Sequence, residues 1–245
     1  MKRSIFIGDV HGCYDEMMKM LERVRYAPGN DSVYFTGDLI NKGPSSVKVV
    51  REIIANGFKC VLGNHEARLL QLTTTPETFW TEKEKRMAEV LEDPFWIADV
   101  VKKWPLWIDT PNALLVHAGL EPGKRKLEEM DPNVILSVRT WDGKGENLNS
   151  PKDPAWFECV KWTKPVIFGH WAAKGLVNVP GFRGLDSGCV YGKSLSAYSP
   201  EEDRLYSVPA AKAYTMIRAQ SLDPRTSNSV ASGQNCGHLC SGIRD

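Results

Sequence analysis

Five apolar segments of the chain each end in side chains that can bind a metal ion. Four of the five histidines lie at these ends, beside glycine or asparagine, together with two aspartates. Buried together without partners, such groups would be costly to desolvate, and metal ions would compensate that cost. The pattern predicts a metal centre, with a purely structural polar network as the alternative. The residues concerned are Asp9, His11, Asp38, Asn64, His65, His117 and His170.

The donor types narrow the choice of metal. Imidazole, carboxylate and amide donors without thiolate suit manganese, iron, zinc or cobalt, and are too rich in nitrogen for calcium or magnesium. About six ligands are more than one tetrahedral ion takes, so we predict two divalent ions, manganese preferred, roughly 3.5–4 Å apart. Asp38 is the expected bridge, because a carboxylate has two oxygens and its strand should lie centrally in the sheet. Such a pair predicts metal-assisted hydrolysis of a phosphoester or phosphoanhydride.

The elements that must position these residues alternate between strand and helix. Residues 4–10, 32–40 and 58–64 have the short, β-branched and aromatic composition of buried strands. Apolar residues at helical spacing separate them, over 14–24 and 44–57. This alternation predicts parallel βαβ units. Because ligands bind outside the carboxyl ends of parallel strands, the metal-binding candidates should converge there.

The remainder of the chain continues with further helices and short strands. Residues 66–104 are helical and rich in lysine and glutamate, whereas 112–119 and 165–170 are again strand-like. After residue 181 the segments shorten into a pattern that predicts antiparallel strands joined by tight turns. Residues 219–245 are polar and of low complexity, which predicts a flexible C-terminal tail outside the fold.

Composition and charge exclude several classes of function. The chain has 245 residues and a formal net charge of +1, so stable nucleic-acid binding is not expected. No apolar run approaches the roughly 18 residues of a membrane helix, and the N-terminal run is too short for a signal peptide. We therefore expect no membrane partner and a cytoplasmic location.

The six cysteines agree with a reducing compartment. Four of them are scattered singly, without the spacing of a disulfide framework. The other two, Cys236 and Cys240, flank His238 in "CGHLC". A metal clip is the alternative there, but no second ligand pair accompanies it, so we favour a flexible tail and leave its role open.

The metal-binding candidates lie within short motifs. In chain order these are "GDVHG" (8–12), "GDLINKG" (37–43), "GNHE" (63–66), "VHAG" (116–119) and "FGH" (168–170). Together they resemble the signature blocks of the calcineurin-like metallophosphoesterases, in the phosphoprotein-phosphatase branch. The resemblance spans residues 8 to about 192. It implies an α/β fold, a metallophosphatase β-sandwich of two mixed sheets flanked by helices, as a domain over residues 1–218.

The resemblance also implies roles for single residues. His65 would be the general acid for the leaving oxygen. The metal ligands would be Asp9 and His11 for the first ion, Asp38 as the bridge, and Asn64, His117 and His170 for the second ion.

Further groups could bind the substrate. The charge that develops on a phosphoryl group needs additional cations, and Lys42 is the first candidate. Arg139 is the second, with a surface ion pair as its alternative, and Asn64 is a further phosphate contact. Trp141, Trp171 or Tyr191 could stack a base, although most such side chains are simply core residues.

Finer features favour a phosphoanhydride as substrate. "FGHWAAKGL" (168–176), "PAWFE" (154–158) and "LDSGCVYGKSL" (185–195) resemble the symmetrical diadenosine tetraphosphatases, the ApaH-like phosphatases. Protein phosphatases carry Asp-Arg-Gly where this chain has Asn41, Lys42 and a glycine. A neutral amide at position 41 would orient the imidazole of His65 but stabilise its imidazolium less, which suits a good leaving group.

We therefore predict an enzyme, a dinuclear-metal phosphohydrolase that cleaves phosphoanhydride bonds in dinucleoside polyphosphates, capped RNA or polyphosphate. A serine/threonine protein phosphatase is the first alternative. A catalytically retired metallophosphoesterase scaffold is the second, and the complete set of ligands argues against it. The sequence leaves open the physiological substrate, the metal used in the cell and the oligomeric state.

Overall fold

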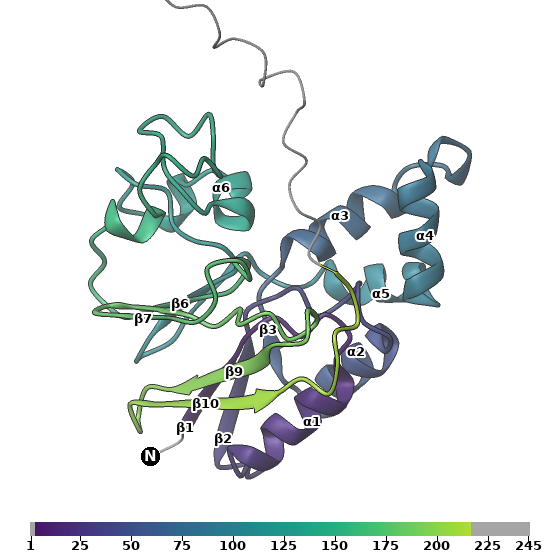
Figure 1. Ribbon diagram of the computed structural model, residues 1–245, viewed down its shortest axis with the longest axis horizontal. Helices are drawn as coiled ribbons and strands as arrows, with labels where there is room; N and C mark the ends of the chain where they lie inside the picture. Colours follow the sequence, from purple (N-terminus) through teal and green to yellow (C-terminus); the bar gives the residue numbers. More distant parts are fainter. Residues whose placement is uncertain (1–2, 217–245) are drawn as a thin grey trace, which may run out of the picture.

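The computed structural model describes residues 3–216, in which two five-stranded sheets form a sandwich flanked by helices (Figure 1). This confirms the predicted fold class. The predicted boundary at residue 218, the tail over 219–245 and the pair Cys236 and Cys240 lie outside the described residues.

The first sheet has the strand order β10-β9-β1-β2-β3. Strands β1, β2 and β3 are parallel, as the alternation of strands and helices predicts, and β9 and β10 run antiparallel to β1 and to each other. The central strand is β1, so the expectation that the strand before Asp38 is central is wrong, because the β9–β10 hairpin extends the sheet beyond β1. The bounds are β1 (Arg3–Ile7), β2 (Asp31–Phe35), β3 (Lys59–Cys60), β9 (Ser194–Ser199) and β10 (Arg204–Pro209).

The second sheet has the strand order β4-β5-β6-β8-β7. Strands β5, β6 and β8 are parallel, and the edge strands β4 and β7 are antiparallel to their neighbours. The strands after residue 181 pair antiparallel, as predicted, in β7–β8 and β9–β10, whereas the pairing of β8 with β6 is parallel. The bounds are β4 (Trp107–Asp109), β5 (Leu114–Val116), β6 (Val166–Phe168), β7 (Val177–Val179) and β8 (Phe182–Gly184).

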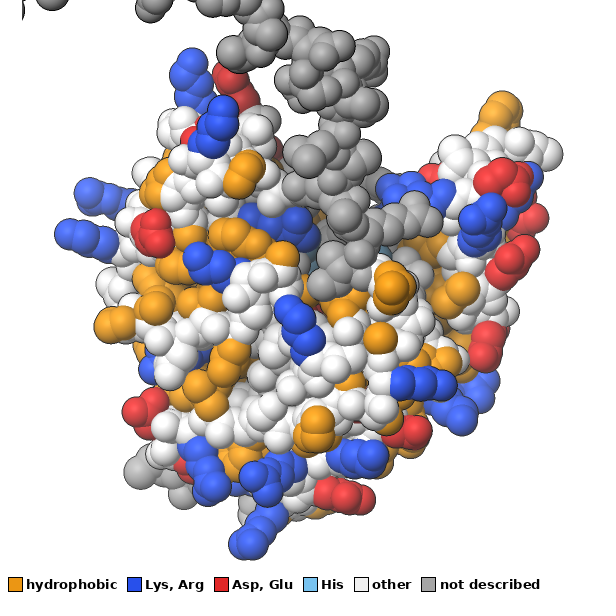
Figure 2. Space-filling model, viewed as in Figure 1, with side chains coloured by type: hydrophobic (Ala, Val, Ile, Leu, Met, Phe, Trp, Pro, Cys, Tyr) orange, Lys and Arg blue, Asp and Glu red, His pale blue; other side chains and the backbone are white. Residues whose placement is uncertain are grey.

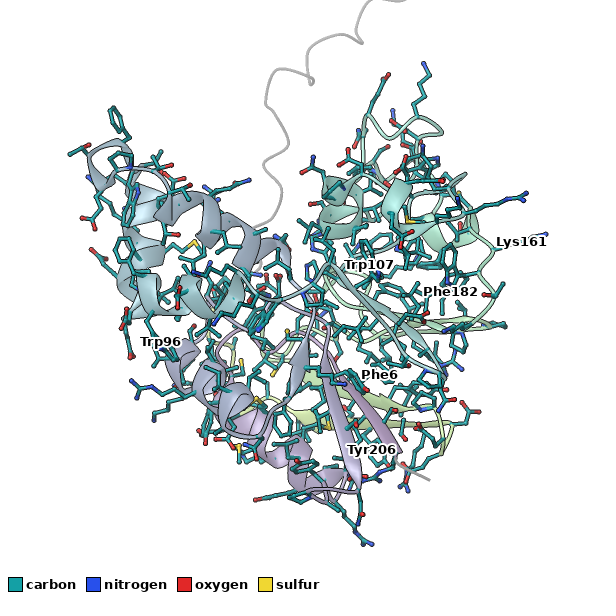
Figure 3. The ribbon with its side chains drawn as sticks, turned by 180° about the vertical axis from the view of Figure 1, so that it is seen from behind. Phe6, Trp96, Trp107, Lys161, Phe182 and Tyr206 are labelled. Carbon is teal, nitrogen blue, oxygen red and sulfur yellow. The ribbon has the colours of Figure 1, made fainter. Side chains whose placement is uncertain are left out.

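Both faces of each sheet are buried, which explains the unbroken apolar runs in the sequence. In β1, Ile5 and Ile7 pack in the cluster beneath the helices, whereas Phe6 packs between the sheets (Figure 3). In β6, Ile167 faces the same inter-sheet layer, and Val166 faces the outer core of the second sheet. Successive side chains along each strand therefore pack in two separate apolar layers, one on each face of the sheet.

Helices cover the outer faces and extend to one side. Figure 1 shows α1 and α2 against the first sheet, α6 over the second, and α3, α4 and α5 as a protruding helical arm. Capping explains two of the helix starts, since Thr81 forms a capping box with Glu84 before α4, and Asp93 caps α5. The bounds are α1 (Tyr14–Arg23), α2 (Ser46–Ala55), α3 (Asn64–Thr73), α4 (Glu82–Leu91), α5 (Pro94–Val101) and α6 (Pro132–Ser137), with 3-10 turns at Glu77–Phe79, Leu127–Glu129 and Trp156–Glu158.

Two strands end earlier than the apolar pattern predicts. Strand β2 stops at Phe35, because Gly37 and Asp38 both take positive φ angles, 88° and 50°, and turn the chain. Strand β3 stops at Cys60, and Asn64 begins α3 rather than ending a strand. The metal-binding candidates therefore lie in loops and a first helical turn just beyond the strands.

The surface carries no dominant charge. Figure 2 shows basic, acidic and hydrophobic side chains interspersed over one face, in keeping with the net charge of +1. Across residues 3–216, none of the helices combines the length and the apolarity that crossing a bilayer requires.

Candidate metal centre

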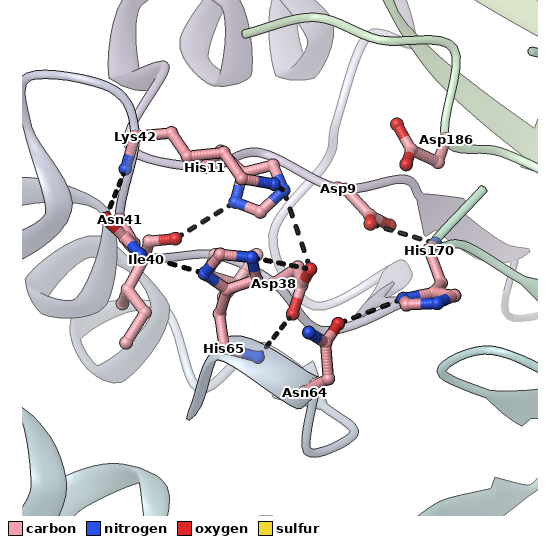
Figure 4. A network of polar contacts seen from close by, with 12 residues as sticks. Asp9, His11, Asp38, Ile40, Asn41, Lys42, Asn64, His65, His170 and Asp186 are labelled. Atoms are coloured by element: carbon pink, nitrogen blue, oxygen red, sulfur yellow. Dashed lines mark hydrogen bonds and ion pairs between the residues drawn. The ribbon is translucent and has the colours of Figure 1, made fainter. Parts of the chain in front are cut away.

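The predicted site residues converge beyond the carboxyl ends of the parallel strands (Figure 4). They arrive from both sheets and from one helix, so residues more than a hundred positions apart in sequence become neighbours. The loop after β1 carries Asp9 and His11, the loop after β2 carries Asp38, Asn41 and Lys42, the first turn of α3 carries Asn64 and His65, and β5 and β6 lead to His117 and His170.

The backbone of the site is strained. Among the described residues, eight that are not glycine have positive φ, and five of these belong to the site. Such left-handed conformations cost free energy and persist where the surrounding structure holds them, typically at functional sites. The five residues are His11, Asp38, Asn41, Lys42 and His170.

One group of potential ligands consists of His11, Asp38 and His65, whose ligand atoms lie within 4.8 Å of one another. The Nδ1 of His11 lies 3.0 Å from the carbonyl oxygen of Ile40, which can only accept, so Nδ1 donates. Burial lowers the pKa of His11, so the ring is neutral and Nε2 keeps its lone pair. That lone pair faces a cation, the Nζ of Lys42, at 2.9 Å.

The second group consists of Asp38, His117 and His170. The Nδ1 of His117 donates to the carbonyl of Thr36 at 2.7 Å, which leaves Nε2 facing the site. This Nε2 lies 2.9 Å from Oδ1 of Asn64, and Nδ1 of His170 lies 3.0 Å from the same oxygen. With its Nδ1 proton given to Thr36, His117 can offer an Nε2 lone pair beside the Asn64 oxygen, and His170 can offer a ring nitrogen, so the donor set fits a divalent ion.

Asp38 belongs to both groups, which places it where the bridging role was predicted. Its Oδ2 lies 3.5 Å from Nε2 of His11, and its Oδ1 lies 3.5 Å from Nε2 of His117. Burial would raise the pKa of Asp38, but the imidazoles that face it and the ammonium of Lys42 lower it below its ordinary value. The carboxyl is therefore ionised and presents one oxygen to each group.

Asp9 lies beside the two groups and is not part of either. Its Oδ1 accepts from the hydroxyl of Thr36 at 2.7 Å, and its Oδ2 accepts from the backbone N–H of His170 at 2.9 Å. Burial and the negative charges of Asp186 and Asp38 raise the pKa of Asp9. A cation nearby would relieve that repulsion, so the role of Asp9 as a ligand of the first ion stays a prediction.

The His65 ring is oriented by Asn41. The Asn41 Oδ1 accepts from the backbone N–H of Lys42 at 2.7 Å, so the amide nitrogen faces Nδ1 of His65, at 2.9 Å, and donates to it. Burial lowers the pKa of His65 to about 4, so the ring is neutral and its proton lies on Nε2. That nitrogen faces the site, 3.9 Å from Oδ2 of Asp38.

Sequence reasoning missed three buried residues that support the site. Thr36 holds Asp9, and Asp186 places a third carboxylate near it. Glu66 accepts hydrogen bonds from four backbone N–H groups, at 2.9 to 3.3 Å, in the loops that carry Asp38 and Asn64. Glu66 is the last residue of the motif "GNHE", and Asp186 is the aspartate of "LDSG", so both were visible in the sequence. Neither motif shows which groups the side chain contacts in the fold. The four donors to Glu66 belong to Asp38, Leu39, Ile40 and Gly63.

We expect Glu66→Ala to lower the free energy of unfolding by about 3 kcal/mol, because four buried N–H groups lose their acceptor. Thermal or denaturant unfolding would measure the loss. Glu89→Ala, on the exposed face of α4, is the matched control and should change stability by less than about 0.5 kcal/mol. Equal stability of the two variants would show that Glu66 does not hold the loop.

The remaining candidates border the centre. The Nη2 of Arg139 donates to the carbonyl of His170 at 3.5 Å, and its buried Nε has no hydrogen-bond partner within residues 3–216. The ring of Tyr191 lies under Nζ of Lys42 at 5.4 Å, and that of Trp171 under Lys174 at 5.3 Å. Trp141 packs against the outer core of the second sheet. The predicted phosphate-binding and base-stacking roles stay predictions.

A sandwich of two mixed sheets, with histidines and aspartates grouped at the strand ends, defines a metal-dependent phosphoesterase. The family model for calcineurin-like phosphoesterases matches residues 2–174. The chain belongs to this family, and the predicted metal-dependent hydrolase is thereby confirmed.

Similar proteins cover most of the chain. A symmetrical bis(5'-nucleosyl)-tetraphosphatase of Actinobacillus succinogenes is 28% identical, over 85% of this chain and 98% of the relative. The enzyme of the same name from Yersinia enterocolitica is 29% identical, over 85% and 92%. A crystal structure described as a candidate diadenosine tetraphosphatase is 33% identical, with a TM-score of 0.75, over 85% and 94%. A metallophosphoesterase from Sphaerobacter thermophilus, 14% identical with a TM-score of 0.53, shares the fold over 86% and 88%.

Proposed function

We propose that this protein hydrolyses phosphoanhydride bonds of dinucleoside polyphosphates, with diadenosine tetraphosphate as the first substrate to test. The observation that carries the proposal is the hydrogen bond from the Asn41 amide to Nδ1 of His65. It holds a neutral ring with its proton on Nε2, which is a weak acid. A weak acid is sufficient for a nucleotide leaving group, which departs more easily than a serine alkoxide. The names of the relatives support the same substrate class.

The metal centre follows from the donor set. In this proposal Asp9 and His11 hold one divalent ion, Asp38 bridges, and Asn64, His117 and His170 hold the other, with manganese preferred for these nitrogen and oxygen ligands. When bound, the two ions supply a water of lowered pKa and neutralise phosphate charge. The backbone N–H of His65 donates to Oδ1 of Asp38 at 2.9 Å, so the bridging carboxylate keeps its orientation.

The cationic side chains orient the substrate. Lys42 reaches into the centre, and Arg139 contributes a buried Nε–H that has no partner among the described residues. Both can donate to phosphate oxygens, and the Asn64 amide nitrogen can serve as a further contact. The Nε2–H of His65 then donates a hydrogen bond to the leaving oxygen and stabilises the charge that develops there.

The proposal is tested with a substrate panel. Protein reconstituted with Mn²⁺, Co²⁺, Zn²⁺ or Mg²⁺ is assayed against diadenosine tetraphosphate, a cap analogue, polyphosphate and a phosphopeptide. We expect phosphoanhydrides to turn over faster than the phosphopeptide, and Mn²⁺ to give the highest rate. Faster turnover of the phosphopeptide would instead establish a protein phosphatase.

Asn41→Asp tests the role of the hydrogen bond between the Asn41 amide and Nδ1 of His65. An aspartate keeps the acceptor for the Lys42 N–H, but it favours a protonated imidazole instead of donating to Nδ1. We expect turnover of alkyl phosphates to rise about tenfold relative to phosphoanhydrides, because the imidazolium is the stronger acid. The ratio of kcat/KM for the two substrate types measures this, and the exposed Asn56→Asp is the control. An unchanged ratio would show that the Asn41 amide does not set the preference for phosphoanhydrides.

Lys42→Met tests the phosphate contact. We expect kcat/KM to fall by roughly 30-fold, because one cation facing the phosphate is lost. Lys42→Arg should keep most of the activity, and Lys48→Met, exposed on α2, should keep all of it. Steady-state kinetics at a fixed, saturating metal concentration give the comparison. If Lys42→Met had the same kcat/KM as the parent, the Lys42 ammonium would have no role in substrate binding.

The cytoplasm is the compartment that we propose. Cys13, Cys60, Cys159 and Cys189 are all free thiols, as expected for a protein kept in a reducing environment.

A further inference from the structure

A second group of potential metal ligands lies outside the hydrolytic centre. Cys13 directly precedes α1, Glu16 lies in the first turn of α1, and Cys189 lies in the loop between β8 and β9. The two sulfur atoms and a carboxylate oxygen of Glu16 all lie within 4.8 Å of one another. All three side chains are buried, with exposed fractions of 1%, 0% and 1%.

The carboxylate of Glu16 is only half satisfied. Its Oε1 accepts from the backbone N–H of Ala211 at 2.9 Å and from the hydroxyl of Tyr214 at 3.0 Å. Its Oε2 is buried and has no hydrogen-bond partner within the described residues. A buried carboxylate oxygen without a donor costs free energy, and a bound cation would remove that cost.

We propose that Cys13, Cys189 and Glu16 bind a divalent cation of the zinc class. Two sulfur donors select a soft or borderline metal, and one carboxylate completes a donor set that zinc accepts. Three protein ligands leave one tetrahedral position for a water. On binding, the two thiols release their protons to solvent, so the metal replaces two protons.

This site differs in chemistry from the hydrolytic centre. Every potential ligand there offers nitrogen or oxygen, whereas two of the three ligands here are sulfur. A cation at this position would join α1 to the loop that follows Asp186, and Glu16 already ties α1 to the segment at Ala211. We therefore assign it a structural role that links two loops bordering the hydrolytic centre.

The test uses the full chain with Cys159, Cys236 and Cys240 changed to serine, so that no exposed or tail thiol competes. The reduced, metal-stripped protein is first filled with Mn²⁺ and then titrated with Co²⁺. We expect a thiolate-to-cobalt charge-transfer absorption, because nitrogen and oxygen ligands produce no such band, and its final intensity should correspond to one thiolate-bound Co²⁺ per chain. With Zn²⁺ in excess, the melting temperature should rise by roughly 5 °C.

Three variants and one control decide the assignment. Cys13→Ala and Cys189→Ala should abolish the band, and Glu16→Gln should weaken Co²⁺ binding at least about tenfold. Cys60→Ala removes a buried thiol outside the group and should leave the band intact. Absence of the band in the reduced parent overturns the proposal, even if the alanine variants fail to fold. A band that survives in Cys13→Ala and Cys189→Ala also overturns it. Because the readout is spectroscopic, it is independent of which substrate the enzyme cleaves.

Discussion

Replacing Asp38 by asparagine is expected to lower kcat for diadenosine tetraphosphate by at least about 10³-fold, with loss of bound metal. The reason is geometric, because one carboxylate presents an oxygen to each of the two ligand groups, 3.5 Å from His11 and 3.5 Å from His117. An amide has one oxygen and no charge, so it cannot serve both ions. A loss of several kcal/mol of transition-state stabilisation by the metal ions corresponds to a fall in kcat of about 10³-fold.

Metal analysis and kinetics together measure this prediction. The parent should hold two divalent ions per chain, whereas Asp38→Asn should hold fewer at the same free metal concentration. Asp99→Asn, at an exposed position on α5, is the control and should match the parent. If Asp38→Asn kept both its metal and its activity, the two-metal interpretation would be wrong.

Replacing His65 by alanine is expected to lower kcat by about 10²- to 10³-fold while metal content stays unchanged. His65 supplies the Nε2 proton that the Asn41 amide keeps facing the site. Without it, the negative charge on the leaving oxygen loses a hydrogen-bond donor. The loss should therefore be largest for substrates with poor leaving groups, and it should shrink as the acidity of the leaving group increases.

A series of aryl phosphates of increasing leaving-group acidity separates this role from a structural one. A general acid predicts a steeper dependence of kcat on leaving-group pKa in His65→Ala than in the parent. Loss of folding or of metal would lower all the rates by the same factor. Glu66→Ala provides the comparison, because it disturbs the loop of Asp38 but keeps the imidazole of His65. Parallel slopes in parent and His65→Ala would assign the leaving-group proton to another donor.

Metal-dependent hydrolysis could be predicted from local motifs in the sequence. Each ligand candidate follows a short apolar segment within a few residues, and parallel strands place their carboxyl ends together, so convergence could be inferred without coordinates. The unbroken apolar runs, such as residues 5–7 and 166–168, indicated strands buried on both faces, and both lie in the sandwich. Donor identity needs only the type of side chain, which is why the metal-dependent hydrolase was predicted.

The bounds of the strands and their order in the sheet were harder to predict from the sequence. Asp38 lies in a turn with positive φ, three residues after β2 ends, because the turn depends on the conformation of Gly37 and on contacts with α3. The hairpin of β9 and β10 comes from the far end of the described chain and moves β1 to the centre of the sheet. Pairings over such separations depend on the whole core and leave little local signal.

The class of chemistry can be inferred from the amino-acid sequence alone, since histidines, aspartates and an asparagine at strand ends supply the ligands whatever their exact orientation. Which atom each residue presents depends on the folded structure. The Asn41 amide sets the His65 tautomer, Glu66 holds the loop of Asp38, and Cys13 meets Cys189. These are contacts between segments as far as 176 positions apart, set by backbone angles and hydrogen bonds that exist only once both sheets have packed.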